Sequence, residues 1–397
     1  MAKKTIRDVE VKSKRVLVRA DFNVPLNIKT GAITDDSRIQ AVLPTIRYLV
    51  DHGARIILCS HLGRPDGKVV EELRMAPVAK RLSKLMGLPV TAGSDCIGAS
   101  IEKAVNELND GDILLLENIR FHAEEETNGS SFAQDLAKLA DIYVDDAFGT
   151  AHRTHASIVG VAQYLPAVAG FLMEKELAAL SIILTNPDHP FCALLGGAKV
   201  SDKINLIQNI LDKVDLLLIG GGMAATFLRM QGYEVGISLV EIDKQALAYE
   251  LVEITKRKEL PLLLPLDVVV ADNISEQATS EIVPIADIPP NKCIADIGPE
   301  TIELFSRQIK QCRTVFWNGP MGVHEIHQFA HGTRKLVELL ANAGAKTIIG
   351  GGSTAEIVDE MGLADKMTHV STGGGASLKF LEGKSLPGVA VLLDKEQ

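Results

Sequence analysis

The chain has 397 residues, of which 46% are hydrophobic and 23% charged, and 51 acidic against 41 basic residues give it a net charge of −10. This composition excludes a disordered chain, because both halves can bury apolar cores, and the length suits two domains rather than one. The acidic balance argues against a nucleic-acid partner, whose phosphates need a basic face, but it leaves room for a local basic pocket.

The cysteines and the first residues predict a cytoplasmic location. The cysteines are odd in number, widely spaced and without a CxxC pair, which favours reduced thiols over a disulfide framework or a zinc ribbon; they are Cys59, Cys96, Cys192, Cys293 and Cys312. The opening "MAKKTIRDVEVKSK" lacks the apolar core of a signal peptide. No uncharged apolar stretch approaches the ~18–20 residues of a membrane helix, so we expect no membrane partner.

In chain order, the first half repeats one pattern: an apolar run, a polar cluster and then a helix-like segment. The runs are "RVLVRADFN" (15–23), "ARIILCSHLGRP" (54–65), "DILLLENIRF" (112–121) and "DIYVDDAFGTAHR" (141–153). Because these runs lack apolar–polar alternation, we expect strands that are buried on both faces and belong to a parallel sheet covered by helices.

The second half repeats the pattern with glycine after most strands. Its runs are "FCALLGGAKVSDK" (191–203), "VDLLLIGGGMAATF" (214–227), "TVFWNGPMGV" (314–323), "KTIIGGGSTAEI" (346–357) and "MTHVSTGGGASL" (367–378). Strand–helix alternation predicts an α/β fold made of two doubly wound, Rossmann-like domains. We place their boundary in residues 171–190, where the helical "FLMEKELAALSIIL" precedes the helix-ending "TNPDHP".

Basic and amide side chains follow all four strands predicted in the first half. Ligands of open parallel sheets bind at the carboxyl ends of the strands, and this is where Asp21, Asn23, His61, Arg64, Arg120 and Arg153 lie in the sequence. Each one alone is better explained as a solvated loop residue or a salt-bridge partner. Together they favour an anionic ligand, because the planar guanidinium binds two oxygens at once, and Arg38 follows a loop that reaches the same place.

The glycine loops of the second half predict anion binding by backbone N–H groups. "GGAKVSDK" (196–203) does not fit a P-loop, but it precedes a predicted helix that carries Lys199 and Lys203 on one face. "IGGGMAA" (219–225) and "IGGGSTA" (349–355) both match a degenerate dinucleotide pattern, and for each a cofactor role and close packing stay open. "STGGGASL" (371–378) favours a functional backbone role.

Histidines three residues apart occur in "HRTH" (152–155) and "HEIH" (324–327). Neither pair has a third ligand at a suitable spacing, so we interpret the first as part of an anion site and the second as a loop.

Eight motifs, in order and over essentially the whole chain, resemble the phosphoglycerate kinase family. They are "RADFNVP", "SHLGRP", "ENIRF", "GTAHRTHAS", "GGAKVSDKI", "GGGMAATFL", "WNGPMGVHE" and "HVSTGGGASLKFLEGKSLPGV". The resemblance implies reversible phosphoryl transfer between ATP and 3-phosphoglycerate, giving ADP and 1,3-bisphosphoglycerate, with Mg²⁺. It also implies two domains that face a cleft, and we expect a monomer.

The resemblance assigns residues to domains and sites. The expected ranges are 1–172 for 3-phosphoglycerate binding, 173–190 for an interdomain helix and linker, 191–380 for nucleotide binding, and 381–397 for a segment that returns to the first domain. The expected substrate site comprises Asp21, Asn23, Arg38, His61, Gly63, Arg64, Arg120 and Arg153. The expected nucleotide site comprises Lys199, Lys203, Asn318, Glu325, Gly351, Gly352, Ser353 and Thr354. The expected catalytic groups are Arg38, Lys203, Gly373, Gly374 and Gly375.

Two positions depart from the family pattern. Ser353 occupies the place where the family usually has an Asp that helps to hold magnesium, so the ion is expected to rest on nucleotide phosphates and water, or to use Glu356. Ile294 replaces a glycine common in the family, which affects nucleotide packing. No residue is assigned as a metal ligand.

Two rival functions remain at this point. One is an NAD-dependent dehydrogenase, based on "GGGMAA" with Glu241 at the distance of a ribose contact. The other is a non-catalytic two-domain anion-binding protein, against which the missing signal peptide argues. The kinase needs no general base, because a carboxylate with a pKa near ~4 is already ionised at neutral pH.

Overall fold

The computed structural model describes residues 2–27 and 29–395 and divides the chain into two compact units. The first unit comprises the residues up to Ala178 and those from Ser385 onward, and the second is Ala179–Lys384. The first division lies inside helix α6 (Phe171–Thr185), and the second lies at Lys384/Ser385, where the sequence suggested 380/381. Residues 1, 28, 396 and 397 of the expected domain ranges lie outside the described residues.

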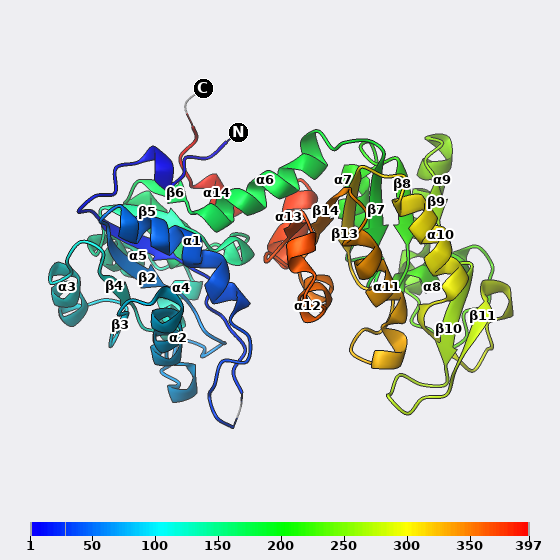
Figure 1. The fold of residues 1–397 in the computed structure, drawn as a ribbon, viewed down its shortest axis with the longest axis horizontal. Helices are drawn as coiled ribbons and strands as arrows, with labels where there is room; N and C mark the ends of the chain where they lie inside the picture. Colours follow the sequence, from blue (N-terminus) through cyan, green and yellow to red (C-terminus); the bar gives the residue numbers. More distant parts are fainter. Residues whose placement is uncertain (1, 28, 396–397) are drawn as a thin grey trace. The chain divides into compact units, whose positions relative to one another are not determined.

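The first unit is built on a six-stranded parallel sheet (Figure 1). Its spatial order is β3 (Thr91–Ala92), β4 (Ile113–Leu115), β2 (Arg55–Cys59), β1 (Arg15–Arg19), β5 (Ile142–Asp145) and β6 (Ala167–Ala169). In the centre, Leu17 lies in register with Ile57 on one side and Tyr143 on the other. Each of these side chains is fully buried, as expected for strands without alternation.

Helices cover this sheet. They are α1 (Ser37–Asp51), α2 (Ala76–Met86), α3 (Ala99–Asn106), α4 (Ala123–Glu126), α5 (Ser130–Lys138) and the first part of α6. The apolar stripes of α1 and α2, which include Ile46 and Leu82, pack with Val16, Ile56 and Val144 of the strands in one core cluster. Burial of such apolar side chains stabilises the layer by roughly 1.5–3 kcal/mol each.

The end of the chain belongs to the first unit. Helix α14 (Pro387–Ala390) lies there, and the Gly388 N–H donates to the Ala151 carbonyl at 2.8 Å. The Leu393 N–H donates to the Ala167 carbonyl at 2.9 Å, beside the edge strand β6. Backbone hydrogen bonds therefore attach the last residues to the sheet of the first unit.

The second unit contains another six-stranded parallel sheet. Its order is β15 (His369–Val370), β14 (Lys346–Ile349), β13 (Thr314–Asn318), β7 (Phe191–Leu195), β8 (Leu216–Ile219) and β9 (Leu262–Leu263). Its helices are α7 (Ile204–Ile210), α8 (Met223–Met230), α9 (Gln245–Arg257), α10 (Pro299–Ile309), α11 (His331–Leu340), α12 (Ser353–Glu360) and α13 (Gly375–Leu381). The two parallel sheets confirm the predicted α/β class and its doubly wound construction.

The second unit also has a small antiparallel sheet that the sequence did not predict. Its order is β11 (Ser280–Pro284), β10 (Asp267–Ala271) and β12 (Cys293–Ile297). Strand β11 is mostly exposed, and its sequence lacks the continuous apolar run on which the prediction of strands relied. Within the described residues, no helix combines the length and apolar character needed to cross a membrane.

Candidate active site

The carboxyl ends of the strands of the first unit gather a cluster of basic side chains. Four guanidinium groups surround His61 closely enough to affect its ionisation; we call Arg19, Arg38, Arg120 and Arg153 the basic cluster. They come from the end of β1, the start of α1, the turn after β4 and the loop after β5. The topology thus brings together three of the arginines that sequence reasoning selected, and it adds Arg19.

His61 lies at the centre of this cluster, where its neutral form is favoured. Burial lowers its pKa well below the ordinary value, and the positive charges of Arg19 and Arg120 lower it further. Arg19 Nη2 lies 3.3 Å from His61 Nδ1. Because a guanidinium can only donate, Nδ1 accepts and the ring hydrogen is on Nε2. The imidazole therefore offers a donor without adding a charge.

Arg38 and Asp21 form an ion pair at the mouth of the cluster. Arg38 Nη1 lies 2.5 Å from Asp21 Oδ2, and the second carboxylate oxygen lies 3.9 Å from His61 Nδ1. The Arg38 side chain is 41% exposed, whereas that of Asp21 is only 12% exposed. The arginine is therefore the partner that can turn toward a ligand, while the carboxylate stays in place.

Asn23, Gly63 and Arg120 are connected by hydrogen bonds. The Gly63 N–H donates to Asn23 Oδ1 at 2.8 Å, and Arg120 Nη1 donates to the Gly63 carbonyl at 2.8 Å. Arg120 also pairs with Glu126 at 3.1 Å, and burial lowers its pKa from the ordinary value. These contacts hold the loops after β1, β2 and β4 against one another.

The last two predicted substrate residues differ in their surroundings. Arg153 is half-buried, and within the described part of the chain its buried Nε has no hydrogen-bond acceptor. Arg64 is exposed, and it is not among the charges that lower the pKa of His61. The structure thus brings Arg153 into the cluster, whereas Arg64 is not one of the four arginines that define it.

A buried hydrogen-bond network holds Arg19 of the basic cluster in place, and the sequence did not predict it. Arg19 Nε donates to Ser157 Oγ at 2.9 Å, and this hydroxyl donates to Glu125 Oε1 at 2.7 Å. Burial alone would raise the pKa of Glu125, but His155, Arg19 and Ser157 together hold it below the ordinary value. The only sequence signal for this network was a charge, Arg19, inside an apolar strand.

In the second unit, the equivalent sheet edge is centred on Lys203. Its ammonium group donates to Asn318 Oδ1, and both side chains are buried. Burial lowers the pKa of Lys203 to about 8, although Asp202 and Glu382 oppose this shift. The loop that follows β7 is thereby joined to the last residue of β13, its neighbour in the sheet.

One expected detail of this region is wrong. Helix α7 begins at Ile204, so Lys199 and Lys203 precede it and do not share a helix face. The residues between them form a turn, in which Ser201 donates from its N–H and its hydroxyl to the Glu241 carboxylate, at 3.0 and 2.5 Å. Lys199 is exposed and helps to lower the pKa of Glu241, after the Ser201 hydrogen bonds that offset burial. The Glu241 carboxylate therefore holds the turn at residues 200–203 in place.

The glycine loops fall into two kinds. A Cβ on Gly221 would lie 2.7 Å from the Gly197 nitrogen, and one on Gly196 would lie 2.3 Å from the Pro320 carbonyl oxygen, so these glycines allow backbone packing. Gly352 and Gly374 have φ of +79° and +48°, yet a Cβ there would meet nothing within 4 Å. Their conformation leaves open space beside the backbone, where an anion can approach.

The remaining predicted nucleotide residues have mixed surroundings. Thr354 is buried, and its hydroxyl accepts from the Gly319 N–H at 2.9 Å. Glu325 is exposed and lies 3.1 Å from His324. The Gly373 N–H donates to Ser371 Oγ at 3.1 Å, which leaves Gly374 and Gly375 as the more open members of that loop. Gly351 packs against the same loop, since a Cβ there would lie 2.6 Å from the Gly374 nitrogen.

Ser353 begins α12 directly after the open Gly352, with the exposed Glu356 one turn later. Among the described residues, a group of three carboxylate, imidazole or thiol ligands occurs elsewhere and not here. A neutral hydroxyl with one carboxylate is a poor set for Mg²⁺, which prefers carboxylate and phosphate oxygens. The side chains therefore do not form a magnesium site by themselves.

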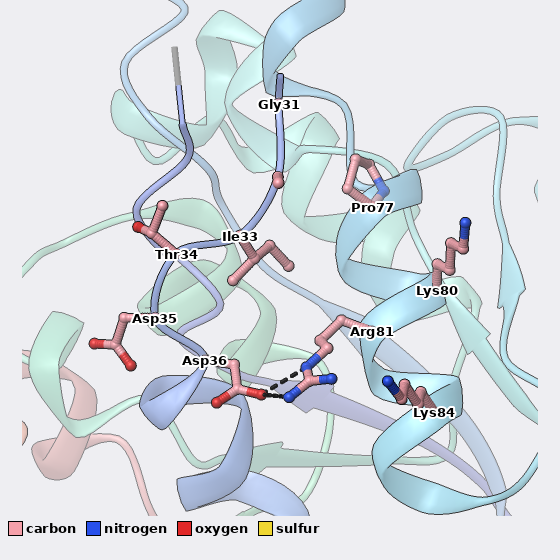
Figure 2. A pocket seen from close by; sticks show the side chains of 10 residues that line it. Gly31, Ile33, Thr34, Asp35, Asp36, Pro77, Lys80, Arg81 and Lys84 are labelled. Atoms are coloured by element: carbon pink, nitrogen blue, oxygen red, sulfur yellow. Dashed lines mark hydrogen bonds and ion pairs between the residues drawn. The ribbon is translucent and has the colours of Figure 1, made fainter. Parts of the chain in front are cut away.

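A groove of the first unit lies apart from these residues. It measures about 620 Å³ and is lined by residues 31–36 and by α2, with Lys80, Arg81 and Lys84 on the helix (Figure 2). Figure 2 shows Arg81 turned toward Asp36, to which it is paired at 2.5 Å. None of the predicted site residues lines this groove.

Comparison with known proteins decides the family. The family profile described as phosphoglycerate kinase matches residues 6–384. The chain belongs to the phosphoglycerate kinase family. It is 56% identical over 395 residues to the phosphoglycerate kinase of Pelotomaculum thermopropionicum and 55% identical to that of Moorella thermoacetica, with full coverage of both chains in each case. The structure of the Coxiella burnetii phosphoglycerate kinase matches with a TM-score of 0.87 at 43% identity, covering 98% of each chain.

Membership confirms the resemblance read from the eight motifs. The chain is a phosphotransferase with a carboxyl group as acceptor, it uses ATP and ADP, and its role is glycolytic. The dehydrogenase and the non-catalytic anion-binding protein are thereby set aside as functions. The dehydrogenase hypothesis depended on Glu241 as a ribose contact. The carboxylate of this residue instead accepts two hydrogen bonds from Ser201, which agrees with setting that function aside.

Proposed function

We propose that the basic cluster of the first unit binds 3-phosphoglycerate and that the open glycine loops with Lys203 hold the nucleotide. The observation that carries the proposal is the gathering of four guanidinium groups around the neutral His61. A small molecule with a phosphate and a carboxylate matches this excess of donors, because guanidinium groups bind such oxygens in pairs. Asn23 and the Nε2–H of His61 would add neutral donors for its remaining oxygens.

In the second unit, the proposed nucleotide site combines one buried cation with backbone groups. Lys203 supplies the charge for the phosphates, and Gly352 and Gly374 supply open backbone next to the starts of α12 and α13. Lys199, Asn318, Glu325, Gly351, Ser353 and Thr354 stay in the proposal as flanking residues. Because Thr354 and Asn318 already have partners in the protein, we assign them to positioning the loops.

The proposed reaction is direct transfer. A carboxylate oxygen of 3-phosphoglycerate attacks the terminal phosphorus of ATP, and the bond from that phosphorus to the ADP oxygen breaks. The nucleophile is already ionised, so no general base is required. What the protein supplies is a positive field for two anions and for the equatorial oxygens in transit, and we assign this to Arg38, Lys203 and the backbone of residues 373–375.

The two ligands are held by different units in this proposal. Transfer requires the reacting atoms to come within ~3–3.5 Å, so we expect the units to approach each other when both ligands are bound. Small-angle scattering with both substrates tests this expectation: a radius of gyration that does not fall would contradict it. We propose that Mg²⁺ arrives with the nucleotide phosphates and water, with Ser353 as a minor contributor, and no step is assigned to it.

Calorimetric titration tests which unit binds which ligand. Arg153→Met removes a guanidinium whose Nε has no acceptor in the described protein, so it should weaken 3-phosphoglycerate binding strongly and leave ADP binding unchanged. Lys203→Met should do the reverse. If Arg153→Met impaired ADP binding as much as 3-phosphoglycerate binding, the assignment of the two ligands to the two units would be wrong.

A further inference from the structure

A cluster of three potential metal ligands lies in the first unit and takes no part in the proposed active site. Asp95, Cys96 and His122 each place one ligand atom so that these atoms all lie within 4.8 Å of one another. Asp95 and Cys96 come from the loop after β3, and His122 follows the turn at residues 119–121. Two segments that are distant in sequence therefore bring a carboxylate, a thiol and an imidazole together.

The three side chains are held in place by their surroundings. Asp95 Oδ1 lies 2.7 Å from His122 Nε2 and accepts from the Cys96 N–H at 2.7 Å. Cys96 Sγ donates to the Glu117 carbonyl oxygen at 3.0 Å. The His122 ring stacks on Phe132, with centroids 4.9 Å apart. Little ordering entropy remains to be lost when an ion binds, because the ligands are already oriented.

Access and charge both suit a divalent cation. Cys96 is fully buried, but the side chains of His122 and Asp95 are 25% and 50% exposed, so the cluster opens to solvent on one side. A thiolate and a carboxylate together neutralise a dication, and the imidazole adds a neutral ligand. This leaves no net charge at a half-buried position, where an uncompensated charge would be costly.

We propose that Asp95, Cys96 and His122 bind Zn²⁺, with water as the fourth ligand. Thiolate, imidazole and carboxylate are the three side-chain ligand types that zinc accepts. Tetrahedral zinc–ligand bonds of ~2.0–2.3 Å place ligand atoms roughly 3.5 Å apart. The 2.7 Å between Asp95 Oδ1 and His122 Nε2 must therefore widen, and any separation near the 4.8 Å limit must shorten; the half-exposed Asp95 side chain can move to allow both. On binding, the Cys96 proton passes to water, and His122 binds through Nε2 with its hydrogen on Nδ1.

Bound zinc would connect the 93–98 loop to the turn that carries Arg120. His122 is two residues from Arg120, yet none of the three ligands belongs to the basic cluster. The ion would therefore stabilise this part of the sheet edge. We expect the melting temperature to rise when zinc is added without other ligands, because zinc would bind the folded state.

Titration of the tag-free, nucleotide-free chain with zinc chloride tests the proposal. We expect one tight site per chain, and a loss of at least about 10–100-fold in zinc affinity in Cys96→Ser and in His122→Phe, which keeps a ring on Phe132. Cys293→Ser, a buried thiol in the second unit, is the matched control and should bind zinc as the parent does. With cobalt(II), the parent should show a thiolate-to-metal charge-transfer band that Cys96→Ser lacks.

The proposal is overturned if the parent has no tight zinc site, if Cys96→Ser and His122→Phe bind zinc as tightly as the parent, or if the cobalt spectrum lacks a thiolate band. Asp95 and His122 would then form an ion pair only. Circular dichroism checks that the variants fold. If Cys96→Ser does not fold, Asp95→Asn and the cobalt spectrum of the parent decide the question.

Discussion

The carboxyl edge of the parallel sheet in the first unit (the first edge) and that in the second unit (the second edge) offer different groups to the anions of the proposed function. In the first unit the edge carries side-chain charge: four guanidinium groups around one neutral imidazole. In the second it carries one buried ammonium group, Lys203, and open backbone at Gly352 and Gly374. The same topology thus supports either a cluster of long cations or a set of peptide groups. Long basic side chains can contact a small acid from several directions, whereas backbone N–H groups can contact phosphates that approach the main chain closely.

The largest effect should come from the charge of the first edge. Arg38→Ala is expected to lower turnover on the order of a hundredfold or more, because loss of one preorganised donor costs roughly 2.7–4 kcal/mol of barrier. Steady-state kinetics with both substrates measures this. Arg47→Ala is the control on the same helix, since Arg47 donates to the Leu85 carbonyl and is not in the cluster. Near-normal turnover in Arg38→Ala would remove this residue from the mechanism.

The pH dependence of the second edge comes next. Burial lowers the pKa of Lys203 to about 8, so its charge is lost as pH rises through that value. Nucleotide affinity of the parent should therefore fall above pH ~8, approaching tenfold per pH unit when one proton is involved. In Lys203→Arg this decline should move to higher pH, because arginine keeps its charge. ADP titration from pH 7 to 9.5 measures it, and identical profiles would exclude Lys203 as the titrating group.

A buried acid at the first edge should make stability depend on pH. Burial raises the pKa of Asp146 to about 7, and its Oδ1 accepts from the Leu172 and Met173 N–H groups at the start of α6. The folded state binds a proton more tightly than the unfolded state, so the stability from this group is present at acidic pH and lost as pH rises through about 7.

Asp146→Asn should flatten this pH dependence while keeping the two hydrogen bonds. For one such group, the free energy of unfolding changes by roughly 1.4 kcal/mol per pH unit between the two pKa values. Denaturant unfolding at pH 5.5, 6.5 and 7.5 measures the difference. An equally steep loss of stability in Asp146→Asn would show that another group is responsible.

The smallest expected effect concerns the second edge and its metal. Ser353→Asp adds a carboxylate at the start of α12, beside the open Gly352, and should tighten Mg²⁺ in the presence of ADP by a few-fold, about 0.5–1 kcal/mol. The magnesium dependence of the rate measures this. Ala355→Asp, two residues further along the same helix, is the control. An unchanged magnesium dependence in Ser353→Asp would place the ion away from this residue.

Much of the first edge could be predicted from the sequence. His61, Arg120 and Arg153 follow apolar runs, and the rule that parallel strands end at one edge is enough to bring them together. Arg38 follows a polar loop, which was expected to reach the same place. The support beneath them could not be predicted, because Glu125 and Ser157 come from separate turns and contact Arg19 only through the fold. Arg64 fitted the same pattern as its neighbours, yet its side chain is exposed and it is not one of the four arginines of the basic cluster.

The second edge was harder to predict because glycine looks the same in every loop. Gly221 and Gly352 both follow a buried strand, in patterns that read alike. Both have a positive φ, but Gly221 allows two backbones to touch, whereas Gly352 has open space beside it. The turn before α7 was also missed, because Ser201 is held by Glu241, which lies 40 residues further along the chain.

The sequence by itself determined the α/β class, the two parallel sheets, and the family, because apolar runs and ordered motifs are local signals that do not depend on packing. The tertiary structure alone decided which side chains act on His61, that Lys203 is buried against Asn318, which glycines are open, and that Asp95, Cys96 and His122 meet. Those features depend on burial and on contacts between distant segments, and burial sets both the pKa of a side chain and the partners it can reach.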